Sequence, residues 1–308
     1  MRGPKMTRPR LEALIEQGRG IGTGDQYLPW IQITRSGTSK TSNQSSVRMP
    51  CLGRRCCFLS QGERYLAHVL WWAGALDVRE QFPLWPWPHA NPYGEIDCTR
   101  EWSKHPGMIE VARRAGIRLY TYPGMMIPAV LTIDLLITIQ LDQATLPTLL
   151  GISCKPQEQY VQAQSVDRLR ERLELDRRYC QAAGIKHVLL HPEQLPSSLP
   201  RQLEWLAPRA TRAEIECLQR SNRYQDFVSR LAEHAYDRPV SDAIRLAKRK
   251  VGWSKLNAES AARTALWLLD VDANPLRSIE FHEPLRPGGR ALKQEIRRRI
   301  FGEAALCN

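Results

Sequence analysis

The sequence has no long apolar run. None of its segments approaches the roughly 18 consecutive apolar residues that a membrane-spanning helix needs. The positively charged residues 1–14 are not followed by the apolar core of a secretory signal. We therefore expect a cytoplasmic protein that has no membrane partner. Its eight cysteines should be mostly reduced thiols in that compartment.

Several signatures of cofactor and nucleophile chemistry are also missing. The glycine-rich stretch 18–24 follows no strand and lacks the Gly-Lys-Ser/Thr ending of a triphosphate-binding loop. There is no G-x-S-x-G elbow and no H-E-x-x-H pair. The cysteines form no C-x-x-C pair, and the adjacent Cys56 and Cys57 fit poorly into one tetrahedral zinc site. These absences disfavour a nucleotide hydrolase, a serine hydrolase and a zinc enzyme.

The charge balance is the unusual part of the composition. Lys and Arg number 44 against 32 Asp and Glu, which gives a formal net charge of +12. A basic excess of this size favours a polyanionic partner such as DNA, because neutralised phosphates release counterions. A generally basic protein without a nucleic-acid partner remains the alternative interpretation.

Hydrophobic periodicity predicts alternating helices and strands in the first two thirds of the chain. The predicted helices cover residues 60–73, 108–115 and 159–183, and the predicted strands cover 130–140, 148–154 and 186–190. The first two strands are close in sequence, so they most simply pair as antiparallel neighbours. This order indicates an α/β domain.

Proline and serine concentrate at residues 192–200, where we place a domain boundary. The predicted domains are therefore 1–195 and 196–308. Helical patterns follow at 213–220, 240–251 and 258–269, then a short extended piece at 278–282 and a basic helix. Three helices followed by an extended element fit a winged-helix or helix-turn-helix unit.

The strongest chemical signal is Asp134, an acid in the middle of an apolar strand. Such a residue is costly to bury unless it is paired or bound to a metal. Lys155 lies 21 positions later, at the end of the next predicted strand. An antiparallel pairing brings both side chains to one end of the sheet, as in the nuclease motif PD…(D/E)-x-K, where the carboxylate holds a divalent cation and the lysine positions water. A purely structural Asp–Lys ion pair explains the same two residues.

Glu63 is a third candidate with two explanations. The sequence Ser60-Gln61-Gly62-Glu63 matches a helix capping box, in which the glutamate hydrogen-bonds back to the cap. The spacing alone favours capping. The two roles are compatible if the start of the helix lies beside the edge of the sheet.

Taken together, these blocks resemble the TnsA family, the endonuclease subunits of heteromeric Tn7-like transposases. The resemblance rests on blocks in the same order: the glycine-rich stretch running into Tyr27-Leu28-Pro29-Trp30, then 59–63, 78–84, 131–134, 153–156 and 173–179. Arg79-Glu80-Gln81-Phe82-Pro83-Leu84 and the glycine/Tyr-Leu-Pro-Trp block are the most specific. The blocks cover about residues 17–190, whereas the C-terminal part matches only in helical character.

The resemblance implies a fold and a function. The fold is α/β: a restriction-endonuclease-like N-terminal domain of the PD-(D/E)XK type with a central mixed sheet, and a mostly α winged-helix-like C-terminal domain. The function is Mg²⁺-dependent cutting of the 5′ strand at transposon ends, together with a TnsB-like transposase and a TnsC-like AAA+ regulator. Two alternatives stay open: a stand-alone restriction or repair nuclease, and a non-catalytic DNA-binding adaptor.

The resemblance also assigns the site. Glu63, Asp134 and Lys155 match the catalytic residues, and Glu63, Asp134, Ser153 and the Cys154 carbonyl match the contacts to one or two Mg²⁺ ions, for which Mn²⁺ can substitute. Ser153 stands where the general nuclease motif has a second acid. The helix acid of the family corresponds to Glu171 or Glu174, because the loop after Lys155 leaves the register open. Residues 85–105 look like an insertion, for which the sequence suggests no role.

Overall fold

The computed structural model describes residues 6–33, 43–140, 146–158 and 166–302. The chain divides into two compact units. The first unit contains the described parts of residues 1–47, 56–67 and 75–194, and the second contains 48–55, 68–74 and 195–302. The second unit therefore takes in two short segments from the N-terminal part of the chain. Whether residues 1–195 and 196–308 form independent domains stays a prediction.

A four-stranded mixed sheet in the order β3-β4-β5-β6 forms the centre of the first unit. Its strands are β3 (Asp77–Leu84), β4 (Leu131–Ile139), β5 (Thr148–Cys154) and β6 (Lys186–Leu190). β4 pairs antiparallel with both β3 and β5, and β6 joins β5 in parallel. The predicted antiparallel pairing of the two apolar runs and the expected mixed sheet are confirmed.

β3 was not among the predicted strands, although all eight of its residues are buried. Its sequence alternates poorly because Asp77, Arg79, Glu80 and Gln81 are polar, so neither period-2 patterning nor apolar content marks it as a strand. Pairing with β4 and ion pairs inside the unit compensate for burying these groups. Tertiary contacts therefore decide this strand.

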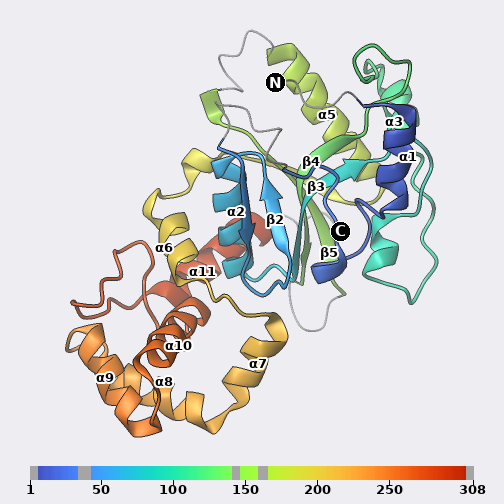
Figure 1. The fold of residues 1–308 in the computed structure, drawn as a ribbon. Helices are drawn as coiled ribbons and strands as arrows, with labels where there is room; N and C mark the ends of the chain where they lie inside the picture. The colour runs from blue at the N-terminus through green and yellow to red at the C-terminus, as the bar shows by residue number, and fades with distance from the viewer. Residues whose placement is uncertain (1–5, 34–42, 141–145, 159–165, 303–308) are drawn as a thin grey trace. The chain divides into compact units, whose positions relative to one another are not determined.

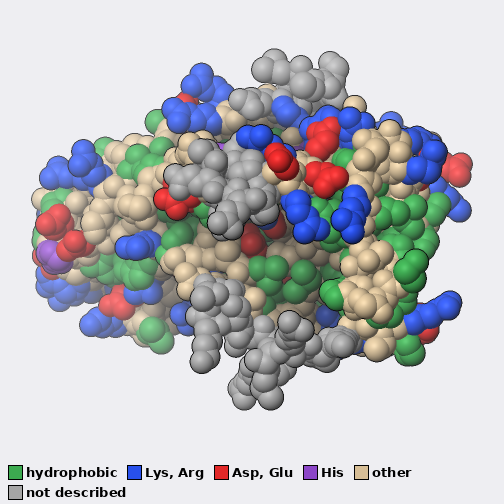
Figure 2. Space-filling model, turned by 90° about the horizontal axis from the view of Figure 1, so that it is seen from above, with side chains coloured by type: hydrophobic (Ala, Val, Ile, Leu, Met, Phe, Trp, Pro, Cys, Tyr) green, Lys and Arg blue, Asp and Glu red, His purple; other side chains and the backbone are tan. Residues whose placement is uncertain are grey.

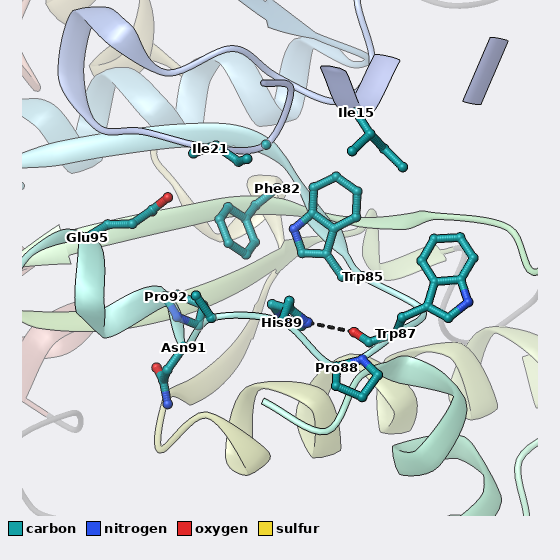
Figure 3. A pocket seen from close by; sticks show the side chains of 12 residues that line it. Ile15, Ile21, Phe82, Trp85, Trp87, Pro88, His89, Asn91, Pro92 and Glu95 are labelled. Atoms are coloured by element: carbon teal, nitrogen blue, oxygen red, sulfur yellow. Dashed lines mark hydrogen bonds between the residues drawn. The ribbon is translucent and has the colours of Figure 1, made fainter. Parts of the chain in front are cut away.

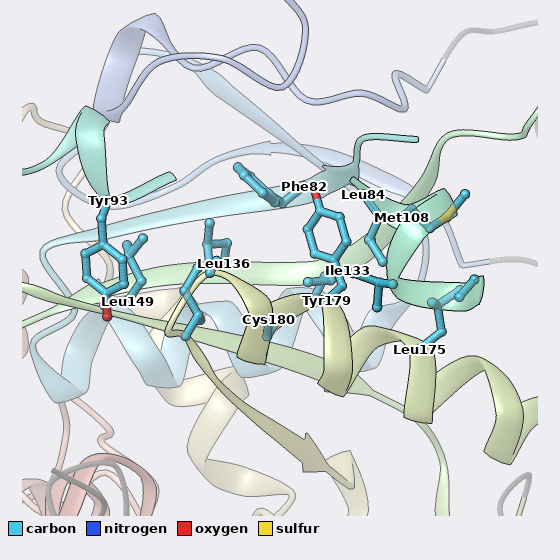
Figure 4. Packing of buried hydrophobic residues seen from close by; sticks show 14 of the residues in the cluster. Phe82, Leu84, Tyr93, Met108, Ile133, Leu136, Leu149, Leu175, Tyr179 and Cys180 are labelled. Atoms are coloured by element: carbon cyan, nitrogen blue, oxygen red, sulfur yellow. The ribbon is translucent and has the colours of Figure 1, made fainter. Parts of the chain in front are cut away.

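One face of the sheet is covered by α5 (Val166–Ala182), which packs on β5, β6 and the shorter α3 (Met108–Ala115) (Figure 1). The predicted bounds of α3 and β5 are confirmed, and part of the predicted helix 159–183 lies outside the described residues. Phe82, Ile133 and Leu136 from the sheet meet Leu175 and Tyr179 from α5 in one apolar core (Figure 4). Each fully buried side chain of this size contributes about 1.5–3 kcal/mol.

The remaining elements of residues 1–194 lie before, between and after these strands in the chain. They are α1 (Arg8–Glu16), η1 (Gly24–Gln26), the two-stranded sheet β1 (Ser45–Arg48) and β2 (Arg55–Phe58), α2 (Gln61–Ala73), η2 (Pro92–Glu95) and η3 (Pro192–Gln194). The predicted helix before Gly74 is thus present as α2. Its last residues, His68–Ala73, belong to the second unit.

Between residues 195 and 302 the described chain is helical and contains no strand. The elements are α6 (Ser198–Leu206), α7 (Arg212–Arg220), α8 (Asn222–His234), α9 (Val240–Val251), α10 (Lys255–Leu268), α11 (Gly289–Arg297) and the π-helical η4 (Arg298–Gly302). The sequence predicted α7, α9, α10 and α11 and missed α6 and α8. The mostly helical character of this part is confirmed.

The predicted extended element at 278–282 is not a strand. Residues 278–280 have no regular structure, and Phe281 and His282 form a turn. The backbone carbonyls of this loop instead accept hydrogen bonds from the first turn of α9. Ser241 N–H donates to the Phe281 carbonyl at 2.7 Å, and Val240 N–H donates to the Glu283 carbonyl at 3.1 Å. The segment therefore pairs with no strand in the described chain. The β-wing that a winged-helix fold requires is not present at residues 278–282.

Candidate active site

Asp134 lies near the start of β4 with its carboxylate largely buried. Its Oδ2 atom accepts two hydrogen bonds, from the Cys154 backbone N–H at 2.7 Å and from Lys155 Nζ at 2.6 Å. Among the described residues, no group donates to Oδ1. One oxygen of this carboxylate is thus held in place and the other is left for a further partner.

Strand register explains why Lys155 reaches Asp134. Leu135 pairs with Ile152 across the β4–β5 ladder, and one further step along the ladder places Asp134 opposite Ser153. β5 ends at Cys154, so the Lys155 side chain leaves the strand beside the Asp134 carboxylate. Its backbone N–H donates to the Leu190 carbonyl at 3.1 Å, which extends the contact with β6 beyond the strand. The structure therefore brings together the two residues that the sequence pattern paired.

Glu63 is buried in the first turn of α2 and forms a variant of the predicted capping arrangement. Ser60 Oγ accepts from Glu63 N–H at 3.1 Å and lies 3.0 Å from Glu63 Oε1, while Leu59 N–H donates to Oε2 at 3.0 Å. Burial and the negative charge of Asp134 together raise the pKa of Glu63 to about 7. Glu63 therefore caps α2 and also faces the Asp134 carboxylate.

Gln81 links these two parts of the site, a role that no sequence pattern indicates. Its Nε2 donates to Glu63 Oε2 at 3.0 Å, while its Oε1 accepts from Thr132 Oγ at 3.0 Å. Gln81 has a φ of 50°, an uncommon value for a residue other than glycine. The amide thereby spans from the start of α2 to the strand that carries Asp134.

The structure places the other predicted site residues as follows. The Ser153 hydroxyl bonds to Asp176 at 3.3 Å and to His187 at 2.9 Å. Glu171 accepts from the backbone N–H of Arg118, and Glu174 is held on the surface by Arg177 and Arg178. No contact joins Glu171 or Glu174 to Asp134 in the part of the chain described. The acid of α5 that reaches the strand ends is Asp176, which the sequence argument did not select.

The donor set suits a hard divalent cation. Two carboxylates face each other here and supply only oxygen ligands, as Mg²⁺ prefers, with its remaining positions left for water or substrate. Within the described ranges, no group of three or more His, Cys, Asp or Glu side chains is arranged to hold a metal. Burial and the charge of Asp134 both disfavour the ionised form of Glu63, and a bound cation would offset both effects. The roles of Ser153 and of the Cys154 carbonyl as ligands stay predictions.

The glycine-rich stretch does not form a phosphate cradle. Gly22 N–H donates to Glu95 at 3.0 Å, and Gly24 N–H donates to Asp77 at 2.9 Å. Both acids also contact the fully buried Arg79 of β3. The backbone donors of the loop are thus used to fasten it to the sheet.

An apolar cavity of about 310 Å³ also opens in the first unit. Trp85, Trp87 and Pro88 of the insertion line it, together with Ile15 and Ile21 from the N-terminal segment (Figure 3). It contains none of Glu63, Asp134 and Lys155, and the acid that lines it, Glu95, is already paired with Arg79 and bonded to the Gly22 N–H. The candidate active site is therefore the strand-end cluster rather than this cavity.

Comparison with known proteins agrees with the geometry. The profile of the family described as TnsA-like endonuclease N terminal matches residues 96–191, which include Asp134, Lys155 and α5. The chain is also 27% identical over 201 residues to the Transposon Tn7 transposition protein TnsA of Escherichia coli, covering 62% of this chain. The chain is therefore similar to TnsA-like endonucleases over the part that holds Asp134 and Lys155.

The match to this TnsA relative covers about 60% of the relative's length. The TnsA-like profile begins after Glu63, so the profile match includes two members of the candidate triad and the structure supplies the third. No helix in the described parts of the chain is long and apolar enough to cross a membrane.

Proposed function

We propose that this protein is a transposon-end endonuclease that hydrolyses the 5′ strand at each end of a transposon. The observation that carries the proposal is the meeting of Glu63, Asp134 and Lys155 at one edge of the sheet in a chain that is similar to TnsA-like endonucleases. An acid pair with an adjacent lysine is the arrangement that phosphodiester hydrolysis by a metal-assisted route requires.

In this proposal Glu63 and Asp134 hold Mg²⁺, for which Mn²⁺ can substitute. The bound ion would polarise a phosphate oxygen and acidify water at the site. The Lys155 ammonium group is bonded to one Asp134 oxygen, and the Lys155 side chain is 26% exposed. That ammonium group orients the attacking water and offsets negative charge that develops on the phosphate.

DNA is the substrate in this proposal, and the formal net charge of +12 supports it. Figure 2 shows Lys and Arg side chains spread over the viewed face with acidic side chains between them, rather than collected in one patch. A spread of this kind favours nonspecific attraction to the DNA backbone over recognition of one sequence. We infer that a TnsB-like transposase supplies the end specificity and cuts the 3′ strand, and that a TnsC-like AAA+ regulator is the further partner.

A strand-resolved cleavage assay on transposon-end DNA tests this function. With the partner transposase and Mg²⁺ present, the protein should add a 5′-strand cut to the 3′-strand cut of its partner. Asp134→Ala and Lys155→Ala should abolish the 5′ cut and leave the 3′ cut. Asp167→Ala, an exposed acid of α5, is the matched control that should cut normally.

Each alternative predicts a different result. Unchanged 5′ cutting in both Asp134→Ala and Lys155→Ala overturns the assignment of the site. Equal cutting without the transposase identifies a stand-alone nuclease. Calorimetry that finds no Mn²⁺ binding dependent on Glu63 and Asp134 identifies a non-catalytic adaptor.

A further inference from the structure

A buried polar network on α5, β5 and β6 lies next to the strand ends that carry the candidate site. Its members are Arg172 and Asp176 of α5, Ser153 of β5 and His187 of β6. Asp176 is 3% exposed and Ser153 is 1% exposed, so these groups must satisfy one another. The proposed mechanism uses neither of the two α5 residues.

The hydrogen bonds of this network have one consistent direction. Asp176 accepts from Ser153 Oγ at 3.3 Å and is paired with the Arg172 guanidinium. Since the single hydroxyl proton of Ser153 points at Asp176, His187 Nε2 must carry the proton that it shares with Ser153 at 2.9 Å. Burial and the charge of Arg172 together lower the pKa of His187 to about 4, so the imidazole is neutral at pH 7.

The network touches the backbone on both sides of Asp134. Arg172 Nη2 donates to the Thr132 carbonyl at 3.0 Å, two residues before Asp134 in β4. Asp176 holds Ser153, the residue immediately before Cys154, whose N–H donates to Asp134. One ion pair on α5 therefore contacts β4 two residues before Asp134 and β5 one residue before Cys154.

The charge of Arg172 distinguishes Asp176 from a metal ligand. Arg172 remains protonated at neutral pH, although burial lowers its pKa to about 10. Its positive charge neutralises the Asp176 carboxylate, which also accepts a hydrogen bond from the Ser153 hydroxyl. A carboxylate that is already paired and hydrogen-bonded has little to gain from a cation, whereas Glu63 and Asp134 face each other with like charge.

We infer that Asp176, held by Arg172, is a positioning residue that aligns the Asp134 carboxylate through Ser153 and the Cys154 N–H. The inference deepens the proposed function and rests on it for the identity of the site. Removing a residue that hydrogen-bonds to a metal ligand typically weakens metal affinity by about 10–100-fold.

Amide hydrogen exchange of the metal-free full-length protein tests the positioning directly. In Asp176→Asn and Ser153→Ala, we expect the Cys154 amide to exchange about tenfold faster, because its bond to Asp134 weakens. The Lys155 amide, bonded to the Leu190 carbonyl, is the internal reference and should keep its rate. Asp167→Asn is the matched control, an exposed acid on the same helix, and should change neither rate.

Calorimetry with Mn²⁺ separates a positioning residue from a ligand. Asp176→Asn should weaken Mn²⁺ binding by about 10–100-fold with unchanged stoichiometry, whereas Asp134→Asn should abolish binding. Loss of binding in Asp176→Asn as complete as in Asp134→Asn overturns the inference and makes Asp176 a ligand. Unchanged Cys154 exchange and unchanged Mn²⁺ affinity in Asp176→Asn also overturn it. A wild-type protein that binds no Mn²⁺ refutes the proposed function, and the Cys154 exchange rate then still decides whether Asp176 aligns Asp134.

Discussion

Asp134 has two oxygens in different situations. Oδ2 is bonded to the Cys154 N–H and to Lys155, and within the described chain Oδ1 accepts no hydrogen bond. Two donors on one oxygen keep the carboxylate oriented, and charge-assisted bonds of this kind are stronger than neutral ones. The proposed Mg²⁺ site would use the oxygen that these two donors leave free.

This asymmetry leads to a prediction for Lys155. Lys155→Ala should reduce 5′-strand cleavage by about a hundredfold or more, because a charge that stabilises the transition state is lost. Mn²⁺ binding should remain, since the ammonium group is not a ligand. Cleavage in the presence of the transposase and calorimetry with Mn²⁺ measure the two effects.

Lys255→Ala is the control for this substitution, because the Lys255 side chain is 83% exposed and lies in α10. It should leave both measurements unchanged. Loss of Mn²⁺ binding in Lys155→Ala would show that the lysine organises the metal ligands rather than the reaction.

His105 links stability to pH at the residue scale. It is fully buried, donates from Nε2 to the Tyr179 carbonyl and accepts from Gly107 N–H. Burial and the neighbouring His89 together lower its pKa from 6.5 to about 4. Between pH 6.5 and 4, the unfolded chain therefore binds a proton that the folded protein excludes, so stability falls as the pH decreases.

We expect His105→Asn to flatten this dependence. Each excluded proton contributes up to about 1.4 kcal/mol per pH unit to the unfolding free energy. Urea unfolding at pH 7 and pH 4.5, followed by tryptophan fluorescence, measures the slope. His282→Gln removes an imidazole that is 74% exposed and should keep the wild-type slope. An identical slope in His105→Asn would mean that other groups carry the pH dependence.

At the scale of elements, the start of α2 determines where Glu63 lies. A Cβ atom at Gly62 would lie 2.6 Å from the Pro192 side chain and 3.6 Å from Cys154 Sγ. Glycine at this position therefore lets the helix approach the end of β5. The close approach brings the Glu63 carboxylate beside the strand that carries the Asp134 contact.

Gly62→Ala tests this approach. Helix propensity alone would stabilise the variant by about 1 kcal/mol. The contact with Pro192 should reverse the sign and cost about 1–3 kcal/mol, because neither a proline ring nor the helix can move freely. Mn²⁺ affinity should fall as Glu63 is displaced, and urea unfolding with calorimetry measures both effects.

The control is Gly94→Ala, where an added Cβ meets no atom within 4 Å. That variant should keep both stability and Mn²⁺ affinity. A Gly62→Ala protein that is more stable than wild type and binds Mn²⁺ normally would show that the close packing is unimportant.

At the scale of the whole molecule, the second unit includes parts of the N-terminal chain. Trp72 of α2 lies under the Lys293 ammonium group, and the Ala73 carbonyl accepts from Arg297 at 2.8 Å. Cys51 N–H donates to the Ala210 carbonyl at 3.2 Å. These contacts are internal to the second unit but connect segments that are distant in sequence.

Cutting the chain at the predicted boundary should therefore harm both fragments. Fragment 1–195 exposes the apolar end of α2, and fragment 196–308 loses the segments 48–55 and 68–74. We expect each fragment to unfold at lower urea than the intact protein and the two to recover stability when mixed. Two fragments that each unfold at the wild-type midpoint would show that the boundary separates independent domains.

The sequence by itself determined the elements whose patterns are local. The apolar runs of β4 and β5, the helix ending at Gly116 and the strand β6 follow from periodicity and helix-stop signals, because backbone preference and side-chain period act over a few residues. The pairing of Asp134 with Lys155 was predictable for the same reason, because burying an acid inside an apolar strand costs free energy unless the acid is paired or bound to a metal.

Only the tertiary structure decided the rest. The polar strand β3, the bridge through Gln81 and the contact of Asp176 with Ser153 depend on residues far apart in the chain. Glu63 shows the difference most clearly. Its sequence neighbours explain a helix cap, but the packing of α2 against the end of β5 is what brings the same carboxylate to Asp134. Local preference cannot encode that approach, because its free energy comes from burial and charge shared between separate elements.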